Sequence, residues 1–544
     1  MLEQQTESGS GDSAAPGRSN RRWWVLGVMS LATLMVFLDN TIVNTAIPTI
    51  SRDLEASISE LQWVIDAYTL VLAGLLLIGG SIGDRYGRRR WMTIGLLIFA
   101  AGSLGAALAG DITMLIAMRG VQGAGAALIL PATLSIITAN FDRDERAKAI
   151  GIWSGVGALG IGLGPALGGY FVDTFGWASV FTMHLPLIGV ILAGMRIVPE
   201  SIDERARKLD IPGAVLGSLG LTALVYGLIR AGEVGWTGGV PVLAFAAAVL
   251  LLAAFIIVEL RTEAPMLPLQ FFRQKDFTGA VIVIGLIMFG MMVSFFFLTQ
   301  FFQIVQGRSA LQAGLLIIPT AVTMMIAAPI SGVLVKRIGP RWLVLASATA
   351  MTTGLLLLTQ ASVDSSTFSI VGPLMLFGLG GGLGLAPLTD TVMAAVPVED
   401  AGIGSAVNDV SRELGAALGI ATVGSFVNAM YRSSFSEAAD GVFPAEAAEA
   451  AGEGIGVAHV VAERLGDAGP ALVETANGAF LDAMTFGFAI GAAFVALAGV
   501  IALTLIPTRM REVQVEADDV VSAGSHDSRP NGTLSDPVPA PAPA

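Results

Sequence analysis

Long apolar segments recur along the whole chain and alternate with short polar stretches. Each holds about 20 residues, enough for a helix to cross a hydrocarbon core of about 30 Å. Backbone groups inside a bilayer must be satisfied within the protein, so these segments predict helices. We therefore expect an all-α, polytopic membrane protein with fourteen transmembrane helices. The predicted spans are 24–47, 62–82, 91–110, 112–138, 149–172, 177–197, 211–230, 240–260, 278–302, 311–335, 341–361, 368–395, 404–428 and 481–506.

The composition supports this interpretation. Of the 544 residues, 54% are hydrophobic and only 13% are charged, which no ordinary soluble domain matches. The first 20 residues are polar and do not form a cleavable signal peptide, so the first apolar helix is expected to act as the internal targeting signal. Cysteine is absent, which excludes disulfides, thiolate catalysis and cysteine metal sites.

Lys and Arg are distributed unevenly between the two sides that the spans define. With the N-terminus inside, 23 of the 30 fall in cytoplasmic segments and five fall outside, as the positive-inside rule requires. This predicts a multi-pass protein of the plasma (inner) membrane with both termini in the cytoplasm. The five outside are Arg52, Arg230, Arg308, Arg432 and Arg464, and two more, Arg119 and Arg412, lie within spans.

The acidic residues add little chemistry. Much of the net charge of −13 lies in 431–480 and in the C-terminal tail, which we interpret as solvated acidic surface. We predict that 431–480 is an external loop with amphipathic helix and that 508–544 is a disordered cytoplasmic tail. The charge indicates no basic partner, and we expect no nucleic acid to bind.

A short basic segment joins the second and third spans. Its sequence is Gly80-Ser81-Ile82-Gly83-Asp84-Arg85-Tyr86-Gly87-Arg88-Arg89-Arg90. Gly83 and Gly87 are expected to let the backbone turn sharply. Asp84 can accept hydrogen bonds from backbone N–H groups at a neighbouring helix end or pair with an arginine. The simplest alternative is a positive-inside turn with no further role.

This segment resembles the signature between helices 2 and 3 of the major facilitator superfamily of secondary transporters. The resemblance implies a gating loop, formed here by Gly80, Gly83, Asp84, Arg85, Gly87, Arg88 and Arg89. A degenerate second copy runs from Gly332 to Arg341 at an offset of 252 residues, with Lys336 in the place of Asp84. The repeat predicts two six-helix halves related by a pseudo-two-fold axis, as transporters use for alternating access.

The repeat also sets the predicted organisation of the chain, because the two copies are eight spans apart and two of these spans must be an insertion. The predicted parts are the cytoplasmic tail 1–22, the first half 23–200, the two inserted helices 201–265, the second half 266–507 and the tail 508–544.

The first span contains an acid within the run Leu38-Asp39-Asn40-Thr41-Ile42-Val43-Asn44-Thr45-Ala46-Ile47-Pro48. A carboxylate deep in an apolar helix is costly and usually functional. The run resembles the signature of the fourteen-span drug/proton antiporters, with Ile47 in place of the usual Leu. The resemblance implies that Asp39 is the coupling or cation-recognition site. The alternative is a structural acid bonded to neighbouring Asn and Thr groups.

The fourth span contains the run Arg119-Gly120-Val121-Gln122-Gly123-Ala124-Gly125-Ala126-Ala127. It matches the family motif Arg-x-x-Gln-Gly-x-Gly-x-Ala at every defined position. An arginine keeps its charge in a protein, so in a membrane it needs an acid or a water-filled cavity. In the family this arginine is linked to proton transfer, and a fixed positive charge helps a nearby carboxyl to release its proton.

The fifth span is rich in glycine between Gly160 and Gly169. Its Gly-Pro-x-x-Gly-Gly run resembles the motif associated with exporters rather than uptake symporters. The alternative is generic small-residue packing. We expect this face to point at the opposite half of the molecule. The motif residues are Gly160, Gly164, Pro165, Gly168 and Gly169.

Other polar residues are secondary candidates. Asp66 in the second span is either a proton or cation site or a solvated acid near the outer mouth. Asp409, Arg412 and Glu413 are spaced for local ion pairs on one helix face, which leaves Glu413 as a further coupling candidate. Asp390, near a cytoplasmic helix end, is expected to be solvated.

The ninth span and its flank are rich in Phe and Met. Such side chains suit an adaptable apolar cavity, although we expect most of them to face lipid. They are Met291, Met292, Phe295, Phe296, Phe297, Phe301 and Phe302.

The sequence contains no catalytic signature. No lysine follows a glycine, so there is no phosphate-binding loop, and neither Gly-x-Ser-x-Gly nor His-Glu-x-x-His occurs. His184, His459 and His526 form no metal-binding motif, and His184 is expected to have a hydrogen-bonded structural role. We predict that the protein is not an enzyme and uses no metal and no cofactor, only the proton gradient.

Together these observations predict a proton-driven antiporter that exports hydrophobic, cationic drugs or toxic compounds. Its expected partners are a small-molecule substrate, protons and the lipid bilayer, with proton and substrate competing at acids of the first half. One alternative is export of an endogenous metabolite, lipid or antibiotic by the same mechanism. Another is a membrane receptor or scaffold that transports nothing.

Overall fold

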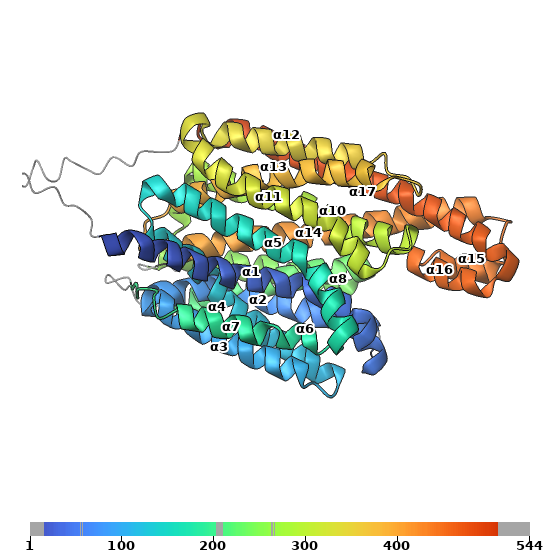
Figure 1. The fold of residues 1–544 in the computed structure, drawn as a ribbon, viewed down its shortest axis with the longest axis horizontal. Coiled ribbons are helices and arrows are strands. Elements are labelled where there is room, and N and C mark those ends of the chain that lie inside the picture. The colour runs from blue at the N-terminus through green and yellow to red at the C-terminus, as the bar shows by residue number, and fades with distance from the viewer. Residues whose placement is uncertain are drawn as a thin grey trace, which may run out of the picture. The chain divides into compact units, whose positions relative to one another are not determined.

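The computed structural model describes residues 16–54, 56, 58–202, 210–262, 265 and 267–509. Within these ranges the regular structure is entirely helical (Figure 1), as the apolar pattern predicts. Most of the two predicted tails and His526 lie outside the described residues.

The N-terminal helices are α1 (Pro16–Asp53), α2 (Ile58–Tyr86), α3 (Arg88–Ala107), α4 (Ile112–Asn140), α5 (Arg143–Phe175), α6 (Ser179–Thr182) and α7 (His184–Gly194). Next come α8 (Ile211–Val234) and α9 (Gly239–Arg261). The C-terminal elements are η1 (Leu269–Arg273), α10 (Lys275–Gln300), the π-helical turn η2 (Phe301–Val305), α11 (Ala310–Ile338), α12 (Pro340–Leu358), α13 (Thr367–Ala394), α14 (Ala401–Ala439), α15 (Ala445–Ala451), α16 (Ile455–Arg464), η3 (Gly466–Ala468) and α17 (Gly469–Leu505).

Twelve of the described helices are long and apolar enough to cross a membrane. Two predicted spans fall outside this set. The span 177–197 is divided into the short helices α6 and α7, and 404–428 lies in α14, which is 39 residues long. Within 404–428, α14 carries the charged residues Asp409, Arg412 and Glu413.

Side chains at the helix starts explain where several helices begin. The Asp111 carboxylate accepts from the Met114 N–H at 2.8 Å and caps α4. Ser309 and Gln312 form a reciprocal capping box at the start of α11. Each cap satisfies backbone donors that the first turn leaves free.

The apolar core falls into separate clusters that follow the order of the chain. Two clusters consist almost entirely of residues from 25 to 198, and the largest consists mainly of residues from 267 to 506. Between these groups, α5 packs against α11 and α2 packs against α14. Helix α8 lies against α2 and α14, while α9 packs mainly against α8. The helix pairs α5–α11 and α2–α14 therefore join the N-terminal and C-terminal helices.

The basic segment after the second span is mostly helical rather than a loop. Helix α2 continues to Tyr86 and α3 begins at Arg88, so only Gly87 separates them. Gly87 has a φ of 108°, a value that suits glycine because it has no Cβ. Gly83 lies inside α2, so the prediction that it forms part of the turn is wrong. The chain reverses at Gly87 alone.

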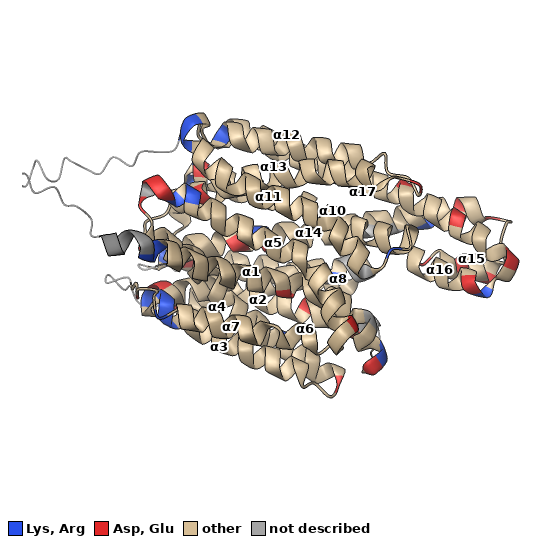
Figure 2. Ribbon diagram, viewed as in Figure 1, with Lys and Arg blue, Asp and Glu red and all other residues tan. Residues whose placement is uncertain are grey.

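The predicted external loop 431–480 is also largely helical. Helix α14 extends to Ala439, α15 and α16 follow, and α17 already begins at Gly469. The Tyr431 hydroxyl donates to the Ala451 carbonyl oxygen at 3.0 Å, which attaches α15 to the extended end of α14. Figure 2 shows acidic residues along α15 and α16, whereas Lys and Arg gather at the opposite ends of the long helices.

Candidate functional site

Asp39 lies in the middle of α1 and has no solvent exposure. Its Oδ2 atom accepts from a terminal nitrogen of Arg119 on α4 at 2.7 Å. Its Oδ1 atom accepts from the side-chain amide of Gln122, one turn further along α4, at 3.3 Å. The two motifs singled out in the sequence therefore meet in one ion pair.

Arg119 is held by groups from three helices. Its Nε donates to the Val64 carbonyl oxygen on α2 at 3.0 Å, and a terminal nitrogen donates to the Gln122 Oε1 at 2.9 Å. The guanidinium also lies over the Tyr68 ring, 4.5 Å from its centroid, an arrangement that stabilises a cation. Gln122 in turn donates to the Ser103 hydroxyl on α3 at 2.9 Å. These contacts hold the guanidinium of Arg119 beside Asp39.

This arrangement can respond to a single proton. Both ions are buried, and loss of one partner from such a pair costs about 3–5 kcal/mol because the other charge stays uncompensated. A proton on Asp39 removes the negative charge and leaves Arg119 with neutral partners. Protonation therefore changes the forces between α1 and α4, which is the kind of event that can bias a conformational equilibrium.

His184 is the residue of this site that the sequence did not reveal. It is the first residue of α7, is fully buried, and lies with its Nε2 atom 3.8 Å from Asp39 Oδ1. Its Nδ1 lies 3.2 Å from the Phe181 carbonyl oxygen, and Phe99 packs edge-on against its ring. The predicted hydrogen bond is present, but the histidine also contacts the acid. No motif around His184 indicates this contact.

The glycine-rich face of α5 packs against α1, not against the opposite half. A Cβ atom at Gly164 would overlap the Thr41 hydroxyl, and one at Gly168 would overlap the Thr45 hydroxyl. A Cβ at Gly160 would likewise meet the α1 backbone. The expectation that these three glycines point at the opposite half is therefore wrong. They allow α5 to approach the helix that carries Asp39.

Other residues of the same run do face the C-terminal helices. A Cβ at Gly162 would overlap the Ala321 methyl on α11, and Gly169 lies opposite Leu311. Pro165 contacts α11 at Gly314, where an added Cβ would lie 2.9 Å from the proline Cβ. Helix α5 therefore has one face on α1 and another on α11.

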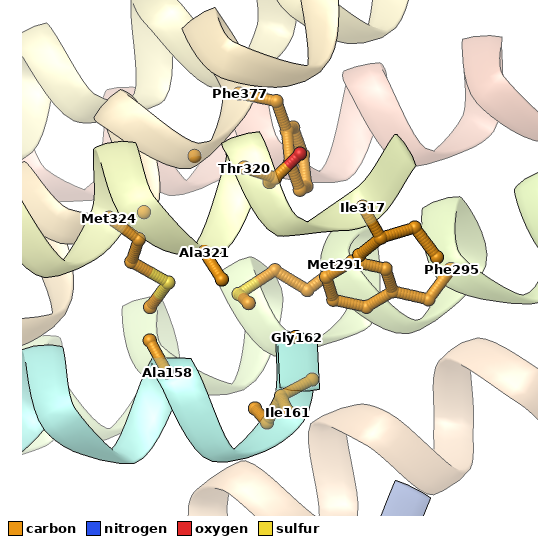
Figure 3. Close-up of a pocket in the computed structure, with 12 residues that line it drawn as sticks. Ala158, Ile161, Gly162, Met291, Phe295, Ile317, Thr320, Ala321, Met324 and Phe377 are labelled. Atoms are coloured by element: carbon orange, nitrogen blue, oxygen red, sulfur yellow. The ribbon is translucent and has the colours of Figure 1, made fainter. Parts of the chain in front are cut away.

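A small apolar cavity lies on the α11 side of α5 (Figure 3). Its volume is about 10 Å³, room for about one water molecule. The structure is thus closed to a drug-sized ligand at this place. The lining includes Gly162, Met291, Phe295, Met324 and Phe377.

The aromatic residues of α10 and η2 are mostly inside the protein. Met291 and Phe295 line the cavity, while Phe297, Phe301 and Phe302 are buried in the core. Phe296 is 40% exposed and is the exception. The prediction that most of them face lipid is therefore wrong, because the helix turns this stripe towards α11, α13 and α17.

Asp84 forms a second buried ion pair, at the end of α2. Its carboxylate accepts from Arg88 at 2.7 Å and from the backbone N–H groups of Gly402 and Ile403 at 2.8–3.2 Å. Asp84 thus caps the start of α14, as its predicted ability to bind a neighbouring helix end implies.

Arg88 extends this contact beyond Asp84. It donates to the carbonyl oxygens of Val398 at 2.7 Å and Glu399 at 3.1 Å, just before α14. Gly80 permits the close approach, since a Cβ there would overlap the Gly402 carbonyl oxygen. Arg85 and Arg89 make no ion pair among the described contacts, although the Arg89 N–H donates to Glu200 at 3.0 Å.

The polar residues of α14 do not pair as predicted. No described ion pair joins Asp409, Arg412 and Glu413. Instead Arg412 donates to the Thr389 hydroxyl at 3.1 Å and lies over the Trp153 ring at 5.4 Å. This places a cation of α14 against α5. The Asp409 carboxylate accepts from the neighbouring Asn408 amide at 3.2 Å.

Asp390 and Asp66, two other acids, lie in different environments. Asp390 is only 3% exposed, so the prediction that it is solvated is wrong: the end of α13 is covered by α5 and α14. Asp66 is half-buried on α2, and no described contact joins it to Asp39. In the described part of the chain, no cluster of three metal-ligating side chains occurs.

Comparison with known proteins adds a family context. The pattern of the Major Facilitator Superfamily matches residues 29–420. The chain is 37% identical over 401 residues to the multidrug resistance protein Stp of Mycobacterium tuberculosis, covering 73% of this chain and 74% of that one. It is 33% identical over 513 residues to the tetracenomycin C resistance and export protein of Streptomyces glaucescens, covering 91% and 94%.

The fold is similar to that of a solved transporter. The chain aligns with the proton:xylose symporter XylE at a TM-score of 0.59 and 16% identity, covering 91% of this chain and 98% of that one. At this identity, the likeness concerns the fold alone.

Proposed function

This chain belongs to the major facilitator superfamily, and we propose that it is a proton-driven antiporter that exports drugs across the plasma membrane. The observation that carries the proposal is the fully buried Asp39–Arg119 pair at 2.7 Å. Two relatives are named for multidrug resistance or for resistance and export. An acid inside a transmembrane helix is energetically costly, and a role in proton-driven drug efflux explains its presence in the first helix.

The proposed membrane arrangement has fourteen spans with both termini in the cytoplasm. It adds two spans, one formed by α6 and α7 together and one by α14, to the twelve apolar helices. Parts 23–200 and 266–507 are the two halves, and α8 and α9 are the inserted helices. The end rich in Lys and Arg, where α2 meets α3 and α11 meets α12, is then cytoplasmic.

In the proposed cycle, ionised Asp39 is paired with Arg119, and a proton from outside neutralises it. The change in force between α1 and α4 passes to α5, because the glycine face of α5 packs directly on α1. The opposite face of α5 lines the small cavity, which we assign to the substrate path. Proton and substrate thus act on two sides of one helix.

The apolar lining, with Met291, Phe295 and Met324, suits hydrophobic compounds of varied shape. A buried acid on the neighbouring helix favours cations among them. A second candidate function is export of an antibiotic that the cell itself makes. The relative named for tetracenomycin C resistance and export, aligned over 91% of this chain, favours that candidate specifically.

Purified protein in proteoliposomes tests the proposal. An imposed pH gradient should drive transport of a lipophilic cation such as tetraphenylphosphonium, and the cation in turn should move protons, read with a pH-sensitive dye. Empty liposomes and Asp39→Asn protein are the controls. A neutral and an anionic compound measured in parallel define the substrate charge. Binding without any transport or proton movement would instead indicate a receptor.

A further inference from the structure

The unassigned group nearest to the buried ion pair is the imidazole of His184. It is fully buried, and its Nε2 atom lies 3.8 Å from Asp39 Oδ1. This separation is too long for a hydrogen bond. Nε2 has no hydrogen-bond partner among the described residues. A buried polar atom without a partner is costly and needs an explanation.

The other ring nitrogen determines which tautomer is present. Nδ1 lies 3.2 Å from the carbonyl oxygen of Phe181. A carbonyl oxygen can only accept, so Nδ1 carries the hydrogen and Nε2 of the neutral ring has a free lone pair. An ionised carboxylate is also only an acceptor. With this tautomer and an ionised Asp39, two acceptors face each other 3.8 Å apart.

The neighbouring groups favour a proton on this edge of Asp39. On the Oδ2 edge, Arg119 already donates at 2.7 Å, whereas Oδ1 has only the longer Gln122 contact of 3.3 Å. Tyr68 on α2 lies against Arg119, and Ser103 on α3 accepts from Gln122. A protonated imidazole alone beside Arg119 would place two positive charges in one dry site. The carboxylate is therefore the more favourable place for the proton.

We propose that His184 is a positioning residue that holds the transported proton on the Oδ1 edge of Asp39. The inference rests on the proposed proton coupling and extends it to a second residue. When a proton arrives from water, it forms an O–H bond at Oδ1, and this group donates a hydrogen bond to Nε2. When it leaves to water, the two acceptors separate again. No other bond forms or breaks.

The test uses infrared titration of the full-length protein, which detects a protonated carboxyl through its C=O band and needs no substrate. The band that disappears in Asp39→Asn belongs to Asp39. In His184→Asn, an amide remains near the Phe181 carbonyl, but nothing replaces Nε2. We expect the titration midpoint to fall by about one pH unit, with the C=O band at higher frequency. A structural role would move neither.

His184→Gln is the matched variant, since its amide oxygen reaches the Nε2 position and can accept from protonated Asp39. We expect its midpoint to return towards that of the wild type, and it serves as the test if His184→Asn does not fold. An unchanged midpoint and band in both variants would overturn the assignment of His184 while leaving proton-coupled export intact. Conversely, a His184-dependent band in a protein that transports nothing would overturn the proposed function alone.

Discussion

Two buried acids near the start of the chain, Asp39 and Asp84, have similar chemistry and different surroundings. Each pairs with one arginine at 2.7 Å. All the described partners of Asp39 lie on α1 to α7, whereas Asp84 and Arg88 bind the start of α14, more than 300 residues away in the chain. The first pair can change without separating the two groups of helices. The hydrogen bonds from the second pair to Val398, Gly402 and Ile403 must break if α2 and α14 move apart.

The repeat offers a third contact of the same kind with the charge reversed. Lys336, at the position equivalent to Asp84, pairs with Asp144 in the first turn of α5 at 3.2 Å. A Cβ at Gly332 would overlap the Ala147 carbonyl oxygen, as one at Gly80 would overlap that of Gly402. Helix α2 therefore approaches α14, and α11 approaches α5, through the same kind of close contact at a glycine. The Lys336–Asp144 pair, however, is exposed and the Asp84–Arg88 pair is buried.

Neutralising Asp39 should have the largest effect. We expect Asp39→Asn to reduce proton-driven export by about a hundred-fold or more, since a buried ion pair is lost and no titratable group remains. The measurement is uptake into proteoliposomes at equal protein density. The double variant Asp39→Asn/Arg119→Gln leaves no uncompensated charge, so its unfolding temperature should approach that of the wild type while transport stays absent. Wild-type transport by either variant contradicts the coupling role.

Two valine substitutions distinguish the two faces of α5. Gly164→Val pushes on α1 at Thr41, and such overpacking should destabilise the fold by about 1–3 kcal/mol. Gly162→Val overlaps Ala321 of α11 and should also cost stability, but it fills the cavity as well, so its transport per folded protein should fall about ten-fold or more below that of Gly164→Val. Thermal unfolding and transport per folded protein, measured on both variants, check the difference. Equal transport per folded protein would show that the two faces do not act separately.

Removing the Asp84 charge should slow the cycle without weakening substrate binding. Asp84→Asn removes a charge-assisted cap from α14, a change of about 1–3 kcal/mol in the closed state. The chain has no cysteine, so a labelled pair at Tyr86 and Val398, both exposed, reports the distance between the end of α2 and the segment just before α14. We expect a larger share of the open state. An unchanged distance distribution together with weaker binding would place Asp84 in the binding site instead.

The smallest effect is expected for the exposed pair. Lys336→Gln should change transport by less than a few-fold, because exposed ion pairs contribute about 0–1 kcal/mol and are screened by salt. The exchange Lys336→Glu/Asp144→Lys should recover whatever Lys336→Glu loses. Transport at low and high salt checks both statements. If Lys336→Gln reduced transport as much as Asp84→Asn does, solvent exposure would not explain why the two contacts differ in importance.

The sequence predicted the helical fold, which follows from patterns within single segments, and it indicated that Arg119 needs an acid or a water-filled cavity. It did not predict which helix each face meets. Gly160, Gly164 and Gly168 share a face by helical spacing, but only the packed structure places that face on α1. The contact between His184 and Asp39 likewise follows only from the packed structure. The contact depends on how α7 lies against α1, and no local pattern encodes it.

Proton release on substrate binding tests the central claim most directly. Detergent-solubilised protein in weak buffer receives tetraphenylphosphonium, and a pH-sensitive dye measures the protons released. The account predicts release by the wild type, equal release by Asp84→Asn and none by Asp39→Asn. Release by Asp39→Asn at the wild-type level would contradict it, and so would the loss of release in Asp84→Asn.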